Sequence, residues 1–165
     1  MALVSVLPRP IDEPLPLDVV ADIASRAARR HSRSDPNPIA HPGGRWHVRL
    51  RVTAHYDVWL IGWGVDSGVE LHDHGDSAGA IAVVRGELVE HTPRFSGGVR
   101  TQRLTAGSVR AFDAGHVHDV VNEGTRPAMS THVYSPPLST MTHFDEQLRP
   151  VRTESVDLPG LVEDR

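Results

Sequence analysis

Two glycine-bounded segments that carry histidine occupy the middle of this chain. In the first, Gly68 is followed after three residues by His72, Asp73 and His74, and the segment closes on Gly86. The second runs through Gly107, Asp113-Ala114-Gly115, His118 and Asn122. Alternate side chains of a β-strand share a face, so we expect His72 and His74 to point the same way and Asp73 to turn outward. Three neutral imidazoles can converge on one divalent cation and leave positions open for other ligands.

This spacing resembles the two-part motif of the cupin superfamily, with Asp113 standing where proline is usual. A single His-x-His pair is weak evidence, but the second segment, with its glycines and asparagine in place, makes the joint match specific. The resemblance implies a β-barrel with a metal held by His72, His74 and His118. His116 is an alternative third ligand, and the motif spacing favours His118 over it.

Short alternating or apolar segments fill the chain from Arg45 onward. We predict strands over 46–52, 56–63, 69–74, 80–84, 87–91, 99–104, 109–112, 117–121 and 128–134, with one late strand near Val151 in an otherwise irregular tail. Turns at Arg85-Gly86 and at Gly97-Gly98 separate some of these segments. Short strands at regular spacing with glycine turns indicate an all-β sandwich or barrel.

The N-terminal part follows a different pattern. We expect residues 1–17 to be extended and broken by proline, and residues 34–44 to form a loop. Between them, Asp18 is a plausible N-cap for a helix that ends near Arg30, because apolar residues recur there at helical spacing. The sequence therefore predicts an all-β fold, a cupin or jelly-roll β-barrel with a short N-terminal helical segment. Its expected division is an extension and helix at 1–44 and a cupin domain at 45–165.

Composition excludes several classes of protein. The chain has no cysteine, which excludes disulfides, a nucleophilic thiol and thiolate ligation of a metal. Its 17 basic residues against 21 acidic ones form no basic stripe for nucleic acid. No apolar run reaches the roughly eighteen residues that a membrane span needs. We expect a soluble cytoplasmic protein, a monomer or homodimer, that binds neither nucleic acid nor membrane.

The predicted metal site lacks a carboxylate. Most cupins place a glutamate four or five residues after the second histidine, where this chain has Ala78 and Gly79. Asp76 comes too early in the pattern to replace it and is expected to support the ligands from behind or to form a turn. A site of neutral ligands keeps the full positive charge of its metal, so an anionic ligand such as a thiolate would complete it well.

Further segments resemble the cysteine dioxygenase family over roughly residues 45–145. They are Trp63 and the runs 71–77 (LHDHGDS), 86–88 (GEL), 130–137 (STHVYSPP) and 143–145 (HFD). The run Ser-x-His-x-Tyr-Ser-Pro-Pro is more specific than the cupin spacing. The resemblance implies addition of both atoms of dioxygen to a thiol sulfur, giving a sulfinic acid, at a ferrous ion held by three histidines.

The resemblance also assigns roles to individual residues. The family's catalytic hydrogen-bond triad matches Ser130, His132 and Tyr134, which alternation puts on one face of a strand. Its substrate-binding arginine matches Arg49, whose planar fork suits a carboxylate. The loop that follows is shorter here, so Arg51 stays open as an alternative. In mammalian members of the family a cysteine crosslinks to the tyrosine. Gly79 stands at that position here, so the crosslink is absent, as it is in bacterial members.

The function implied by the resemblance is Fe(2+)-dependent conversion of L-cysteine and O2 to cysteine sulfinic acid, a step of cysteine catabolism that leads toward taurine and sulfinate metabolism. One alternative is a dioxygenase of another small thiol such as 3-mercaptopropionate, although members with that preference tend to carry glutamine in place of the arginine. Another is a metal-binding cupin module that binds a ligand without turnover. A zinc or nickel isomerase is less favoured because the glutamate is missing.

Overall fold

The computed structural model describes residues 12–33 and 44–156. Within these ranges the chain forms one helix and eleven strands. The elements are α1 (Leu17–His31), β1 (Arg45–Val52), β2 (Asp57–Trp63), β3 (Gly68–His72), β4 (Ala78–Arg85), β5 (Glu87–Pro93), β6 (Val99–Thr105), β7 (Val109–Phe112), β8 (His118–Val121), β9 (Ala128–Ser135), β10 (Thr140–Phe144) and β11 (Pro150–Ser155). The expected all-β fold with a short N-terminal helix is confirmed.

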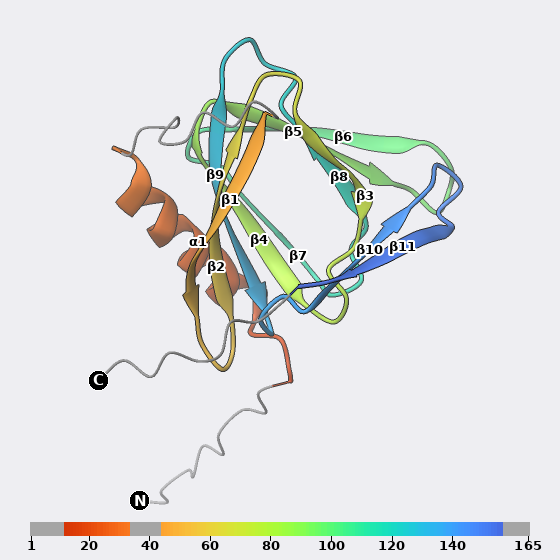
Figure 1. Cartoon of the computed structure of the whole chain (residues 1–165), viewed down its shortest axis with the longest axis horizontal. Helices are drawn as coiled ribbons and strands as arrows, with labels where there is room; N and C mark the ends of the chain where they lie inside the picture. Colours follow the sequence, from red (N-terminus) through yellow and green to blue (C-terminus); the bar gives the residue numbers. More distant parts are fainter. Residues whose placement is uncertain (1–11, 34–43, 157–165) are drawn as a thin grey trace, which may run out of the picture.

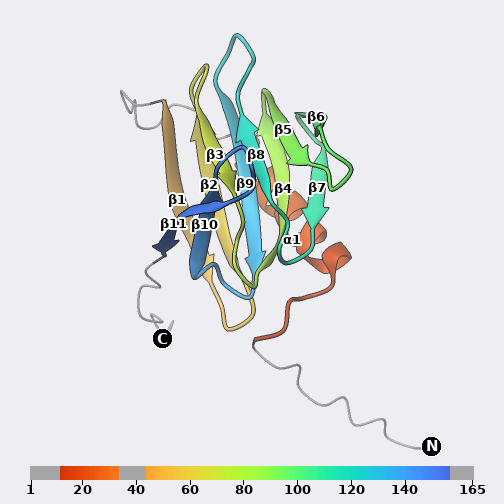
Figure 2. The same cartoon turned by 90° about the vertical axis from the view of Figure 1, so that its right-hand side faces the viewer.

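The strands form two antiparallel sheets that face each other (Figure 1). One sheet has the order β1-β2-β9-β4-β7, and the other has the order β11-β10-β3-β8-β5-β6. In Figure 2 the six-stranded sheet lies toward the viewer and the helix lies behind the five-stranded sheet. Side chains that point between the sheets therefore come from strands far apart in the sequence.

Strand β4 shows how the sequence separates the two faces of the five-stranded sheet. Ile81 and Val83 belong to the apolar core between the sheets. Ala80 and Ala82 alternate with them and pack on the helix side. The small alanine side chains allow α1 to lie close against β4 and β9, which it contacts extensively. Burying one large aliphatic side chain contributes about 1.5–3 kcal/mol, so both layers stabilise the fold.

Helix α1 packs through a stripe of small residues, and its start differs from the prediction. Val20, Ala24 and Ala28 recur every four residues and are buried against the sheet. The helix begins at Leu17 with Pro16 as its N-cap, so Asp18 lies in the first turn instead of at the cap. An acidic residue there still favours the helix, because it faces the positive end of the helix dipole. Residues 1–11 of the extended segment predicted at 1–17, and residues 34–43 of the loop predicted at 34–44, lie outside the described residues.

Two strand predictions need correction. Strand β3 ends at His72, so His74 lies just beyond it in the loop before β4. Strand β10 was expected to be irregular; it pairs with β11 along its length but with β3 only at His143 and His72. All six residues of β11 are exposed, so this hairpin buries few apolar side chains and leaves a weak pattern in the sequence.

No helix among the described residues is long and apolar enough to cross a lipid bilayer. The division into an extension at 1–44 and a cupin domain at 45–165 stays a prediction.

Candidate metal centre

The six-stranded sheet brings the three predicted ligands together. His72 ends β3, His118 begins β8, and the antiparallel register places these two residues opposite each other. His74 follows two residues after His72, and its ring lies 4.8 Å from the His72 ring. Each of the three side chains offers a ring nitrogen, and these atoms all lie within 4.8 Å of one another. All three residues are buried, with 1–3% of their surface exposed.

The hydrogen bonds of these rings leave nitrogens that a metal can use. The Nδ1–H of His72 donates to the carbonyl oxygen of Glu70 at 2.6 Å, and the Nδ1–H of His118 donates to Glu90 at 2.7 Å. Both acceptors are oxygens without protons, so each ring keeps a lone pair on Nε2. Neither ring nitrogen of His74 has a hydrogen-bond partner among the described residues. Buried polar atoms without partners are rare, and a divalent cation between the rings would give a partner to one of these two nitrogens.

The electrostatics of the trio fit the same interpretation. Burial, followed by the neighbouring His118, lowers the pKa of His72 to about 3. Burial and His118 also lower the pKa of His74 well below its ordinary value. The rings are therefore neutral at pH 7, which is the form that binds metals. The trio contains no carboxylate. Ala78 and Gly79, which stand where most cupins have a glutamate, lie in β4, and Asp76 lies in the turn before it.

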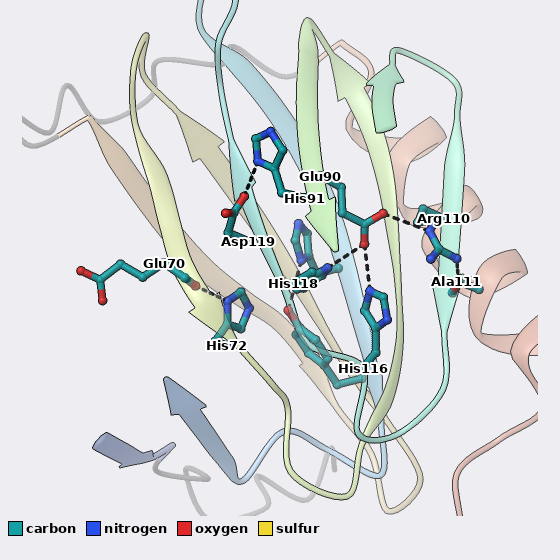
Figure 3. A network of polar contacts seen from close by, with 11 residues as sticks. Glu70, His72, Glu90, His91, Arg110, Ala111, His116, His118 and Asp119 are labelled. Atoms are coloured by element: carbon teal, nitrogen blue, oxygen red, sulfur yellow. Dashed lines mark hydrogen bonds and ion pairs between the residues drawn. The ribbon is translucent and has the colours of Figure 1, made fainter. Parts of the chain in front are cut away.

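A buried glutamate behind the trio was not predicted from the sequence. Glu90 lies on β5 with 1% of its surface exposed, and its carboxylate accepts hydrogen bonds from three groups (Figure 3). One oxygen accepts from His118 Nδ1 at 2.7 Å and from His116 Nε2 at 3.0 Å, and the other accepts from Arg110 Nε at 3.0 Å. Burial alone would raise the pKa of Glu90, but these hydrogen bonds hold it well below its ordinary value. Glu90 therefore carries a negative charge that orients His118.

Glu90 also separates the roles of the two neighbouring histidines. Glu90, His116 and His118 form a second group whose ligand atoms lie within 4.8 Å of one another. Within it, His116 Nε2 and His118 Nδ1 already donate hydrogen bonds to the carboxylate. This group therefore orients a ligand of the trio and is not itself a second metal site. The signal that could have identified Glu90 is its alternation with Leu88, which is fully buried on the same strand.

The predicted triad forms a continuous hydrogen-bond chain on β9. Ser130 Oγ lies 2.9 Å from His132 Nε2, and His132 Nδ1 lies 3.1 Å from the Tyr134 hydroxyl. The indole of Trp63 extends the chain, because its Nε1–H donates to Ser130 Oγ at 2.9 Å. The Tyr134 ring stacks on His74 with 4.9 Å between centroids, so the chain ends beside the metal centre.

The direction of this chain follows from its first donor. Indole can only donate, so Ser130 accepts from Trp63 and its own proton points to His132 Nε2. In the other tautomer of His132, the buried Ser130 hydroxyl would lack an acceptor among the described residues. His132 therefore carries its proton on Nδ1 and donates to the Tyr134 oxygen. The Tyr134 proton is then free to point toward the metal centre.

Arg49 and Arg51 diverge at an irregularity of β1, where the register shifts between them. Arg49 turns inward: its side chain is 9% exposed, and its Nε lies 3.5 Å from the buried carboxylate of Asp57. Its guanidinium also lies 4.2 Å above the ring of Trp59. Arg51 is exposed and lines a groove beside α1 on the other side of the sheet.

A cavity of about 430 Å³ opens between β1 and the β10–β11 hairpin. Its polar lining includes Arg45, His47, Tyr134 and His143. Arg49 is not among the lining residues. His143, which is buried opposite His72, and Arg45 were not predicted as site residues; alternation along β1 puts Arg45 on the same face as His47 and Arg49.

Comparison with solved structures identifies the fold. An oxalate oxidase in complex with glycolate superimposes with a TM-score of 0.55 at 16% identity, covering 63% of this chain and 57% of that one. The TT1209 protein from Thermus thermophilus gives a TM-score of 0.53 at 20% identity, covering 60% of this chain and 90% of that one. A cupin superfamily protein from Desulfitobacterium hafniense gives 0.50 at 12% identity, covering 59% and 82%. These likenesses show the fold alone.

Comparison of sequences identifies the family. The family model "Cysteine dioxygenase type I" matches residues 42–147. Cysteine dioxygenase type 1 from Bos taurus is 30% identical over 101 residues, covering 56% of this chain and 50% of that protein. The Danio rerio protein of the same name is 29% identical over 102 residues, covering 56% and 51%. The chain spans about half the length of the curated relatives it matches. From the family match and the shared fold, the chain belongs to the cysteine dioxygenase type I family of the cupin superfamily.

Proposed function

We propose that this protein is an Fe(2+)-dependent thiol dioxygenase that converts L-cysteine and O2 to cysteine sulfinic acid. The observation that carries the proposal is a trio of buried, neutral imidazoles next to a directed hydrogen-bond chain that ends on Tyr134. The reaction RSH + O2 → RSO2H balances without a further reductant, because both oxygen atoms go to sulfur and sulfur supplies the electrons.

His72, His74 and His118 would hold the metal. When bound, Fe(2+) supplies a redox-active centre on which a thiolate and dioxygen can be brought together. The trio contributes no negative charge, so an anionic thiolate fits the site better than a neutral ligand does. The hydrogen bond from His118 to Glu90 supplies negative charge one layer further out.

Tyr134 would donate a hydrogen bond to the reacting groups. Burial raises the pKa of its hydroxyl above the ordinary value, and Asp57 adds to this, so the hydroxyl stays protonated at pH 7. Ser130 fixes the ring of His132, and His132 donates a hydrogen bond to the Tyr134 oxygen. The proton of the Tyr134 hydroxyl therefore points away from His132. We expect Tyr134→Phe to keep its metal and lose much of its rate, measured as oxygen uptake at saturating thiol. Unchanged turnover would remove Tyr134 from the mechanism.

Arg49 is the residue that the family resemblance assigns to the substrate carboxylate. Its guanidinium lies inside the fold, as that role requires, but it lies beside Asp57, whose side chain is fully buried. The proposed assignment to Arg49 therefore predicts that Asp57 either shares the arginine with the substrate or turns away when substrate binds.

Oxygen uptake by the iron-loaded protein tests the function. Cysteine, 3-mercaptopropionate, cysteamine and homocysteine would be compared, with sulfinate measured by mass spectrometry. We expect cysteine to give the highest kcat/KM and one sulfinate per O2 consumed. His74→Ala, which removes one ring of the trio, should abolish both signals. A protein that binds iron yet oxidises no thiol in the panel would be a binding module instead.

A further inference from the structure

We propose that Asp73, which lies between two of the metal ligands in the sequence, is a positioning residue of the metal centre, and that its carboxylate holds the backbone of His74 in place. This inference rests on the metal site of the proposed function and deepens it, because it names what orients the ligand whose ring makes no hydrogen bond within the described ranges.

The three ligands differ in how their rings are held. His72 and His118 each donate a hydrogen bond from Nδ1 to an oxygen, at 2.6 Å and 2.7 Å. Both ring nitrogens of His74 lack a hydrogen-bond partner in the described part of the chain. The His74 ring instead stacks between Phe112 and Tyr134, at centroid distances of 5.0 Å and 4.9 Å. Stacking fixes the plane of a ring but lets the ring slide within that plane, so the place of its nitrogens depends on the backbone that carries it.

The backbone of His74 lies outside the strands. Strand β3 ends at His72 and β4 begins at Ala78, so no strand ladder holds the residues between them. The carbonyl oxygen of His74 accepts a hydrogen bond from the Ser77 N–H at 3.1 Å, within the turn that leads to β4. The position of His74 therefore depends on what joins this short segment to the rest of the fold.

The carboxylate of Asp73 closes a turn around His74. Its Oδ1 accepts a hydrogen bond from the Gly75 N–H at 3.2 Å. Aspartate side chains often bond to the backbone two residues further on, and here His74 is the middle residue of that turn. Gly75 has a φ of 57°, and a Cβ at this position would collide with Thr140 Oγ1 of β10. The turn is therefore fitted closely against β10, and its backbone has little room to shift.

The same carboxylate oxygen joins the turn to β10. Asp73 Oδ1 accepts a hydrogen bond from the Thr142 N–H at 3.0 Å, and the Asp73 N–H donates to the Thr142 carbonyl oxygen at 2.9 Å. Strands β3 and β10 pair only at His72 and His143, so these two hydrogen bonds extend the contact beyond that pair. One oxygen of Asp73 thus binds both the turn and the neighbouring strand, which fixes the backbone of His74 relative to His72.

Three variants separate the acceptor from the charge. Asp73→Ala removes the oxygen to which the N–H groups of Gly75 and Thr142 donate. Asp73→Asn removes the charge but keeps an Oδ1 with two lone pairs, and asparagine forms the same turn. Asp76→Ala is the matched control, because Asp76 lies in the same loop, is exposed, and makes no side-chain hydrogen bond within the described residues.

Binding of Co(2+) without oxygen measures the effect and needs no turnover. The Kd would come from competition with a chelator, and the visible absorption spectrum of bound Co(2+) reports the number and arrangement of its ligands. We expect Asp73→Ala to raise the Kd about tenfold to a hundredfold, as loss of a group that orients a metal ligand does, and to alter the spectrum. Asp73→Asn and Asp76→Ala should match wild type in both measurements.

Two results would overturn the inference. Asp73→Ala with the Kd or the spectrum of wild type would show that His74 is placed without the carboxylate, even if urea unfolding finds the metal-free variant less stable. Asp73→Asn as weak as Asp73→Ala would show that the charge matters and the acceptor does not. If circular dichroism shows that Asp73→Ala is unfolded, Asp73→Ser replaces it, because serine forms this turn more weakly. Weaker Co(2+) binding by Asp73→Ser than by Asp73→Asn then supports the inference, and equal binding contradicts it.

The two proposals can fail separately. If the iron-loaded protein oxidises no thiol but the Asp73 variants bind Co(2+) as expected, the proposed function fails and the positioning role stands. If wild type forms sulfinate and Asp73→Ala binds Co(2+) as wild type does, the function stands and the role of Asp73 is wrong.

Discussion

Glu90→Gln tests whether the carboxylate that accepts a hydrogen bond from His118 strengthens metal binding. The carboxylate of Glu90 accepts hydrogen bonds at both oxygens, from His116 and His118 on one side and from Arg110 on the other. Glutamine keeps the shape but offers one acceptor and one donor. Whichever way the amide turns, its NH2 group faces an N–H group, so at least one buried donor loses its acceptor.

The expected magnitude follows from this mismatch. An unsatisfied buried donor costs about 1–3 kcal/mol. Loss of a carboxylate that orients a metal-binding histidine typically weakens metal affinity about 10–100-fold, which corresponds to about 1.4–2.8 kcal/mol. We therefore expect the Kd of Glu90→Gln for Fe(2+) or Co(2+) to rise within that range, with no change in the number of metal ions bound.

Competition with a chelator under anaerobic conditions would measure the affinity. Glu87→Gln is the matched control, because Glu87 lies three residues earlier on β5 and pairs with Arg103 at the surface. The control should bind metal as wild type does. A Kd for Glu90→Gln equal to that of the control would refute the reasoning, because it would show that His118 is oriented without its carboxylate.

Three further substitutions test other parts of the account. Trp63→Phe removes the donor that directs the Ser130 hydroxyl, so kcat should fall about threefold to tenfold at nearly constant KM. An unchanged kcat would contradict the proposed direction of the hydrogen bonds from Trp63 to Tyr134. Burial raises the pKa of Asp57 to about 6, so between about pH 4 and pH 7 the folded state binds more protons than the unfolded state. As pH rises through this range, the wild-type protein should therefore lose up to about 3 kcal/mol of stability relative to Asp57→Asn. Urea unfolding of the two proteins across the range measures this difference. Parallel curves for the two proteins would exclude this charge cost. Gly79→Ala places a Cβ 2.5 Å from the Phe112 ring, so it should destabilise the protein by about 1–3 kcal/mol in the same assay, and wild-type stability would show that the ring moves freely.

Most of the fold could be predicted because local pattern and burial agree. Strand β4 alternates between alanine and larger aliphatic residues, and β9 is buried throughout, so both give clear signals. Strand β10 could not be predicted, because three of its five residues are polar and every residue of its hairpin partner β11 is exposed. Its contribution, His143 opposite His72, depends on a pairing between residues distant in the sequence.

The site divides in the same way. Motif spacing gave the trio, and alternation gave the hydrogen-bond chain from Ser130 to Tyr134. Glu90 was missed because a charged residue on a strand is usually exposed, and only the three donors around it make its burial favourable.

Isotope labelling of the product tests the central claim most directly. The iron-loaded protein would be given L-cysteine under ¹⁸O2, and the sulfinate would be analysed by mass spectrometry, with His74→Ala as the control. The account predicts a product that contains two ¹⁸O atoms and a variant that forms none of it. Three outcomes would contradict the account: formation of cystine and hydrogen peroxide instead of sulfinate, sulfinate oxygen that comes from water, or equal sulfinate from the variant. Each would show that the three imidazoles do not support a thiol dioxygenase reaction.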